Sequence, residues 1–261
     1  VDKNNKALMP TKPSRARRWI KEGKATPFWK RGVFCVRLNV EPSAREYQEV
    51  AVGIDPGSKR EAFTVKSEAH TYLNVQASAP DWVKDAMNVR KVMRLSRRRK
   101  WTPYRQPRWN RVGGLQKGSL PPSTLARWQW KLRVVKWLAK MFPITRFVIE
   151  DIKAHTFGGK KWNISFSPLQ QGKEWLYSRL HKIASVELKH GWETKDLREA
   201  TGLKKISSKM SESFYAHVVD SWVLANSWTG GHLKPDNITM LLIDPLHFHR
   251  HCQHFSLPIS Q

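Results

Sequence analysis

The chain has 261 residues, and its 47 Lys and Arg against 21 Asp and Glu give a formal net charge of +26. Because so basic a chain repels itself, we exclude an ordinary soluble enzyme and expect a polyanionic partner. Nucleic acid fits this role, since each neutralised phosphate releases counterions, whereas no clear amphipathic membrane helix, lipidation signal or apolar run of about 18 residues is found.

A short basic helix is predicted near the start of the chain. It begins at Ser14, a suitable N-cap, and ends at about Glu22, just before Gly23. Residues 33–40 alternate between apolar and polar and predict a strand. Three more strands are expected over residues 49–54, 60–66 and 70–77, and their close succession predicts a three-stranded meander.

A strongly basic helix is expected after the meander, up to about residue 100. Trp82, Ala86, Val89 and Met93 recur at helical spacing and form one apolar stripe. Basic residues crowd the same helix and repel one another unless they are neutralised. We therefore expect RNA contacts from Arg90, Arg94, Arg97, Arg98 and Arg99, and also from Arg15, Arg17 and Arg18 of the first helix.

Helices and strands alternate in the second half of the chain. Helices are expected over residues 121–141, 167–184 and 208–228, and strands over residues 145–152 and 185–192. The strand over residues 145–152 is a β-rich apolar run, which suits a strand buried on both faces. The whole order, three strands and then helix, strand, helix, strand, helix, predicts an α/β fold.

Four polar residues stand out because they lie in apolar elements of a chain with few acids. Asp55 ends the first strand of the meander, and Glu150 lies within the apolar strand. His217 and Asp220 are three residues apart on the last helix and so face the same way. Buried charges are costly unless they are paired or bind a metal. Converging carboxylates would suit two Mg²⁺ or Mn²⁺ ions about 4 Å apart, which could activate water and stabilise the leaving oxygen of a phosphodiester.

Each of these residues also has a structural explanation. Asp55 could cap a turn, because Asp-Pro-Gly is common turn chemistry. Glu150 could pair with an arginine, His217 could be a hydrogen-bonded core histidine, and Asp220 could belong to a buried ion pair. The set of four, in this order and on these elements, is more specific than any member.

The motifs around these residues resemble the three split RuvC motifs of RNA-guided nucleases. They read Val-Gly-Ile-Asp55-Pro-Gly-Ser-Lys, Val-Ile-Glu150-Asp and His217-Val-Val-Asp220-Ser. Two further segments resemble the PLMP domain of the IscB family of OMEGA nucleases: Ala7-Leu8-Met9-Pro10 and Arg15-Ala-Arg-Arg18. The Arg-rich helix resembles that family's bridge helix.

This resemblance implies an RNase H-like (RuvC) fold that is split in sequence. It implies that Asp55, Glu150, His217 and Asp220 are catalytic, and that Asp55, Glu150 and Asp220 hold two Mg²⁺ ions, for which Mn²⁺ could substitute. The implied domains are a PLMP-like domain (1–45), the first RuvC part (46–80), a bridge helix with linker (81–112), the second and third RuvC parts (113–230) and a C-terminal segment that could contact the target-adjacent motif (231–261).

The sequence departs from IscB in one important way. IscB proteins carry an HNH nuclease between the second and third RuvC motifs, but here only roughly 65 residues separate Glu150 from His217, enough for a helix, a strand and their connections. The chain therefore resembles IsrB, the relative that lacks HNH. That likeness implies a nickase that cuts the non-target strand of double-stranded DNA, guided by an ωRNA. It further implies a monomeric protein in a ribonucleoprotein of the prokaryotic cytoplasm, with no membrane partner.

Several features leave alternatives open. Trp101, Tyr104 and Trp109 could stack on unpaired bases or pack in a core. The C-terminal histidines have no recognised zinc spacing, so contact with phosphate or bases is favoured for His247, His249, His251 and His254. The distant pair Cys35 and Cys252 suits reduced thiols of a cytoplasmic protein.

Two other functions compete with the guided nickase. A guide-free, structure-selective RuvC-type nuclease would not need the Arg-rich helix. A non-catalytic RNA-binding protein would not need all four polar residues of the candidate site. Copurification of a long RNA would favour the guided enzyme over the guide-free one.

Overall fold

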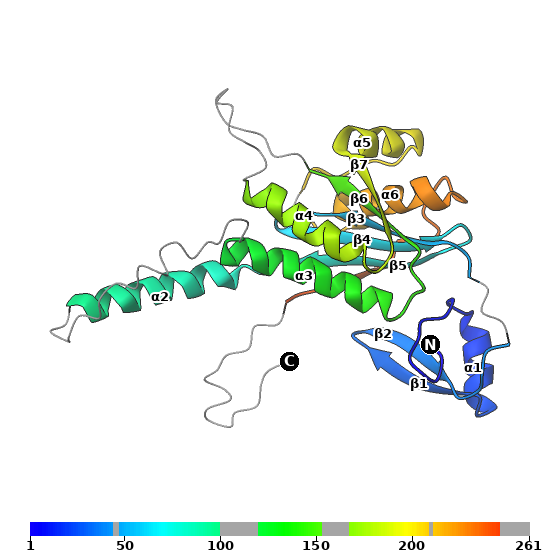
Figure 1. The fold of residues 1–261 in the computed structure, drawn as a ribbon. Coiled ribbons are helices and arrows are strands. Elements are labelled where there is room, and N and C mark those ends of the chain that lie inside the picture. Colours follow the sequence, from blue (N-terminus) through cyan, green and yellow to red (C-terminus); the bar gives the residue numbers. More distant parts are fainter. Residues whose placement is uncertain (44–46, 100–119, 153–166, 209–210, 246–261) are drawn as a thin grey trace.

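The computed structural model describes residues 1–43, 47–99, 120–152, 167–208 and 211–245, with the backbone alone for residues 97–99. Its elements (Figure 1) are α1 (Pro13–Lys21), β1 (Ala25–Lys30), β2 (Val33–Leu38), β3 (Val50–Asp55), β4 (Arg60–Ser67), β5 (Thr71–Ser78), α2 (Trp82–Arg99), α3 (Pro122–Ala139), β6 (Arg146–Asp151), α4 (Pro168–Leu180), β7 (Ser185–His190), α5 (Gly191–Ala200), the π-helix η4 (Phe214–Val218), α6 (Val219–Thr229) and β8 (Met240–Ile243).

A six-stranded mixed sheet in the order β7-β6-β3-β4-β5-β8 forms the centre of the molecule (Figure 1). β3, β4 and β5 form an antiparallel meander. β6 and β7 extend it in parallel beyond β3, and β8 pairs in parallel with β5. A meander that is extended by two parallel strands beside its first strand is the RNase H-like arrangement. The α/β, RNase H-like fold predicted from the sequence is therefore confirmed.

Helices cover both faces of this sheet. α3 and α4 pack on one face, where Phe63, Trp137 and Leu176 belong to the main hydrophobic cluster. η4 and α6 pack on the other face, where Ala62 and Trp222 belong to a second cluster. Ala62 and Phe63 are neighbours in β4, so their side chains point to opposite faces, as a strand requires. The two helical layers are visible on either side of the sheet in Figure 1.

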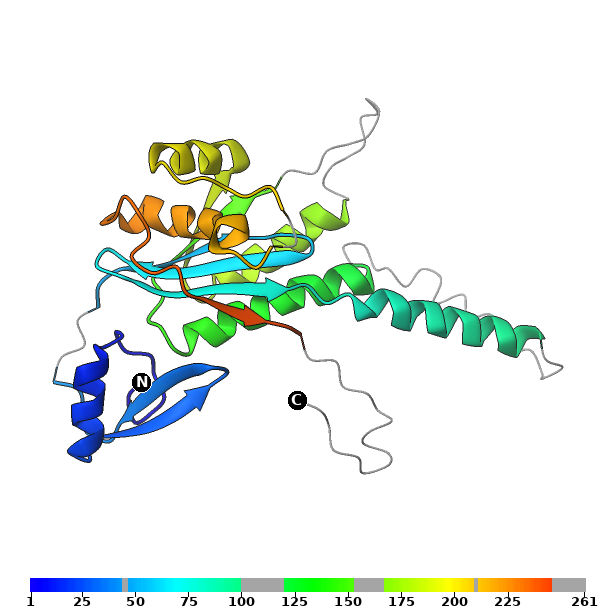
Figure 2. The same ribbon diagram turned by 180° about the vertical axis from the view of Figure 1, so that it is seen from behind.

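The N-terminal unit combines α1 with an antiparallel hairpin of β1 and β2. Arg31 and Gly32 form the hairpin turn with φ of 50° and 81°, the left-handed pair that a tight two-residue turn needs. β1 is absent from the prediction because Pro27 weakens its strand pattern, although an edge strand tolerates proline. Figure 2 shows this unit beside the end of α3.

α2 projects away from the rest of the protein (Figures 1 and 2). Val83 is buried near its start, but Val89 and Met93 are 58% and 51% exposed. The apolar stripe predicted for this helix therefore packs only at the beginning. The exposed remainder presents both apolar and cationic side chains to a partner, which fits the predicted contact with nucleic acid better than a place in the core.

The structure adds three further differences from the prediction. α5 and β8 were not predicted, because α5 is largely polar and β8 has only four residues in a mixed tail. The last helix begins at Phe214 rather than near residue 208, and its first turn is π-helical. Within the described residues, none of the helices is long and apolar enough to cross a membrane.

Candidate metal centre

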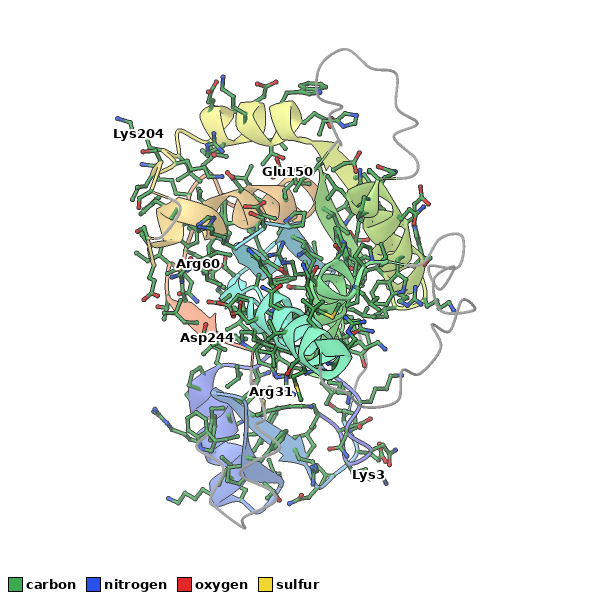
Figure 3. The ribbon with its side chains drawn as sticks, turned by 90° about the vertical axis from the view of Figure 1, so that its left-hand side faces the viewer. Lys3, Arg31, Arg60, Glu150, Lys204 and Asp244 are labelled. Atoms are coloured by element: carbon green, nitrogen blue, oxygen red, sulfur yellow. The ribbon has the colours of Figure 1, made fainter. Side chains whose placement is uncertain are left out.

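Three carboxylates converge where β3 and β6 end and α6 begins. Asp55, Glu150 and Asp220 each offer an oxygen, and these oxygens lie within 4.8 Å of one another. β3 and β6 are parallel neighbours with Ile54 opposite Ile149, so Asp55 and Glu150 come to the same end of the sheet. Carboxyl ends of strands are the usual place for ligands in α/β sheets. Figure 3 shows Glu150 between α5 and α6.

The close approach of α6 to β3 brings Asp220 to the two strand carboxylates. Gly53 makes this approach feasible, because a Cβ there would lie 1.8 Å from the Ser221 carbonyl oxygen and 2.7 Å from the Ala225 nitrogen. Gly53 is two residues before Asp55 and so lies on the same face of β3. A side chain at this position would push away the helix that carries Asp220.

Buried hydrogen bonds fix α6 on the sheet next to Asp220. The Thr64 and Ser221 hydroxyls are 2.8 Å apart, and the Ser221 hydroxyl donates to the Val218 carbonyl at 2.9 Å. The Thr64 hydroxyl also donates to Asn74 Oδ1 at 3.1 Å. Such a buried and satisfied network orients the helix as well as stabilising it.

Asp220 contacts two cations from the segment that precedes η4. Arg198 donates to Asp220 Oδ1 at 2.5 Å, and Lys205 donates to Asp220 Oδ2. The Asp220 side chain is only 4% exposed, so these contacts compensate for its burial. The notebook of simple explanations for this residue thus contains one correct element: Asp220 does belong to an ion-pair network, as well as to the carboxylate cluster.

The carboxylates of the cluster perturb one another. Burial raises the pKa of Asp55 to about 6, with Asp220 adding to the shift and Lys205 opposing it. Burial and the charges of Asp55 and Asp220 raise the pKa of Glu150 to about 7. Burial would lower the pKa of Lys205, but its contacts with Asp220 and the other two carboxylates outweigh this and raise it. A divalent cation would relieve the repulsion among the acids, and their hard oxygens suit Mg²⁺ or Mn²⁺.

Glu150 and its neighbour Asp151 have different surroundings. Asp151 accepts from Lys173 at 2.5 Å and from the Tyr177 hydroxyl at 3.3 Å, both on α4. It thereby ties the end of β6 to the α4 face of the sheet. Glu150 points to the carboxylate cluster instead, and its Oε1 would be 2.8 Å from a Cβ at Gly191. The acid with a structural ion pair is therefore Asp151.

His217 lies in η4, immediately before the turn that carries Asp220. It is partly exposed, and its ring nitrogens are not among the ligand atoms that lie within 4.8 Å of one another. The structure thus brings together three of the four predicted residues and places the fourth on an adjacent π-helical turn. Short π-helical segments inside helices are frequent at functional sites.

The predicted RNA-binding arginines are exposed where the structure describes them. Arg90 and Arg94 lie on the projecting part of α2, and Arg15, Arg17 and Arg18 lie on α1. The side chains of Arg97, Arg98 and Arg99 lie outside the described part of the structure. So do Trp101, Tyr104, Trp109, Cys252 and the C-terminal histidines.

A cationic cleft of about 520 Å³ was not predicted from the sequence. It lies between the β1–β2 turn and the solvent face of α3, and its charged lining residues are all basic: Lys30, Arg31, Arg133, Lys136 and Lys140. None of the five forms a salt bridge with another described residue. The helical spacing of Arg133, Lys136 and Lys140 was the available signal, but only the fold brings the hairpin turn to them.

Comparison with known proteins gives one family and one structural likeness. A family model described as RRXRR protein matches residues 1–172. No curated protein matches the sequence. Among solved structures, the chain is similar to T. thermophilus RuvC in complex with a Holliday junction substrate, at 13% identity and a TM-score of 0.32, over 70% of this chain and 98% of that chain.

Proposed function

The chain belongs to the RRXRR protein family, and we propose that it is an ωRNA-guided DNA endonuclease that nicks the non-target strand, as its motifs resemble those of IsrB. The observation that carries this proposal is the convergence of Asp55, Glu150 and Asp220 within 4.8 Å. Three acids from separate elements of so basic a chain need a strong reason to lie together. Binding of divalent metal ions provides that reason.

The proposed roles follow from the placement of each residue. Asp55, Glu150 and Asp220 would hold two Mg²⁺ ions, which when bound polarise a phosphodiester and lower the pKa of water. Arg198 keeps Asp220 ionised and oriented through its 2.5 Å contact. His217 would accept a proton as general base, a role for which imidazole suits neutral pH.

Guidance by RNA is supported by the distribution of positive charge. The cationic cleft lies on the α3 side of the sheet, opposite the α6 side that holds the carboxylates. Cations far from the reacting phosphate do not help chemistry, but they can hold a second nucleic acid through its backbone. Together with α2, they suit an RNA that reads the target by base pairing while the protein grips its backbone.

Cleavage of one strand is supported by the presence of a single acidic cluster among the described residues. The segment between β6 and η4 contains α4, β7 and α5, and β7 belongs to the same sheet. These elements complete the RNase H-like unit, and the described part of the segment holds no second nuclease domain. One site then cuts one strand per binding event.

Nicking of a supercoiled target plasmid tests the proposal. The protein, purified with its RNA, should convert the plasmid to the open circle in Mg²⁺, and Asp55→Ala should abolish this yet keep RNA binding. Cleavage that persists after removal of RNA would instead support a guide-free nuclease. Bound RNA with no Mg²⁺-dependent cleavage would support a non-catalytic RNA-binding protein.

A further inference from the structure

The two cations that contact Asp220 are held very differently. Arg198 projects from α5 and its side chain is 16% exposed, whereas the Lys205 side chain is 35% exposed. Each occupies a different oxygen of Asp220, Oδ1 for Arg198 and Oδ2 for Lys205. Both carboxylate oxygens are therefore engaged, so a metal ion at Asp220 must compete with one of these cations.

Lys205 is the cation that can leave. Its ammonium is a point charge on a flexible stem, and a third of the side chain already faces solvent. Arg198 is more buried and belongs to a helix that packs against α6. Repulsion between a divalent ion and an ammonium on the same carboxylate favours departure of the more mobile group.

The backbone around Lys205 keeps the side chain at the site after it leaves Asp220. The Leu203 amide donates to the Arg198 carbonyl at 3.1 Å, and the Ile206 amide donates to the Tyr215 carbonyl at 2.8 Å. Leu203 also packs against the second hydrophobic cluster. With both flanks tied, the ammonium can move only over the length of its own stem, that is, within the mouth of the carboxylate cluster.

We propose that Lys205 is a displaceable cation, which neutralises Asp220 in the metal-free protein, leaves it when a divalent ion binds, and then contacts a non-bridging oxygen of the scissile phosphate. This inference rests on the proposed nuclease function. The displaced ammonium needs an anion nearby, and a phosphodiester held at the carboxylates is the anion that the reaction brings. Lys205 thus adds to the four residues that the motifs identify.

Two measurements on Lys205→Met test both halves of the proposal, with Lys204→Met as the matched control. Lys204 is exposed and projects from the edge of the protein (Figure 3). The first measurement is Mn²⁺ affinity of the full chain without nucleic acid, by titration calorimetry, where the specific signal is the one that Asp55→Ala removes. Lys205→Met should tighten it about fivefold or more, from the loss of one unit charge about 4 Å from the ion.

The second measurement is the nicking rate at saturating Mg²⁺. Lys205→Met should slow it about tenfold or more, because a charged donor to the transition state is lost. Lys205→Arg should retain much of the rate, since a guanidinium also binds phosphate. Unchanged Mn²⁺ affinity in Lys205→Met, or an unchanged rate at saturating metal, would overturn the inference. If wild type shows no Mn²⁺ signal that depends on Asp55, the proposed function itself fails.

Discussion

Replacement of Gly53 by alanine adds one methyl group where β3 meets α6, and its effect follows directly from the packing. The new Cβ would lie 1.8 Å from the Ser221 carbonyl oxygen, whereas ordinary contacts begin at 3.4 Å. The helix must therefore retreat by about 1.6 Å, the difference between these two distances. Because the obstacle is backbone, no change of rotamer relieves it.

We expect two consequences of Gly53→Ala. Overpacking of this kind costs about 1–3 kcal/mol, which lowers Tm by several degrees in a chain of this size. The larger effect falls on the metal centre, because α6 carries Asp220 while Asp55 and Glu150 stay on the sheet. A misplacement of about 1 Å can reduce a reaction rate by about a hundredfold, so we expect nicking to fall by at least that factor.

Three assays and one control make this prediction refutable. Thermal melting, Mn²⁺ affinity and nicking rate would be compared with those of Gly202→Ala, where nothing lies within 4 Å of the added Cβ and only the φ of 67° causes strain. That control should lose about 1 kcal/mol of stability and keep its metal affinity. Metal affinity and nicking of Gly53→Ala equal to those of the control would refute the idea that Gly53 sets the position of Asp220.

Three other predictions address charge. The folded-state pKa of Asp55, about 6, exceeds its ordinary 3.8, so this carboxylate destabilises the metal-free fold as pH rises through 6. Asp55→Asn should thus raise stability in EDTA at pH 8 by about 1–3 kcal/mol, with little gain at pH 4; a lower Tm at pH 8 would contradict this. The fully buried Glu61 lies 2.5 Å from Lys131, so Lys131→Met should cost about 3–5 kcal/mol in urea unfolding and a second change, Glu61→Leu, should recover most of it; no recovery would argue against the pair. Arg133→Glu with Lys136→Glu should weaken RNA binding and reduce its salt dependence by about 1 per lost phosphate contact, while unchanged filter-binding curves would remove the cationic cleft from the RNA interface.

The sequence predicts the central fold well because its strands are long and apolar on the buried faces. β3 and β6 are apolar through their length, and each ends with the acid that joins the cluster. These patterns are local, so they can be recognised without a structure. β8 and β1 could not be recognised, since four apolar residues and a proline-containing edge strand obtain their structure from pairing rather than from their own sequence.

The candidate site shows the same division. Asp55, Glu150 and Asp220 stand out as acids in apolar elements, and the structure brings them together. Arg198 and Lys205 could not be distinguished from the other 45 basic residues, because only α5 and the following loop place them at Asp220. Contacts between distant segments leave no periodic trace in the sequence.

The most direct test of the metal-centre account is cleavage of a target duplex labelled on each strand, by the wild-type ribonucleoprotein and by Glu150→Gln. In Mg²⁺, the account predicts a wild-type product on the non-target strand alone, its loss in EDTA, and no product from Glu150→Gln, which keeps the shape of the side chain but lacks its charge. Cleavage by Glu150→Gln at the wild-type rate, or wild-type cleavage in EDTA, would contradict the assignment of the three carboxylates as a nuclease centre.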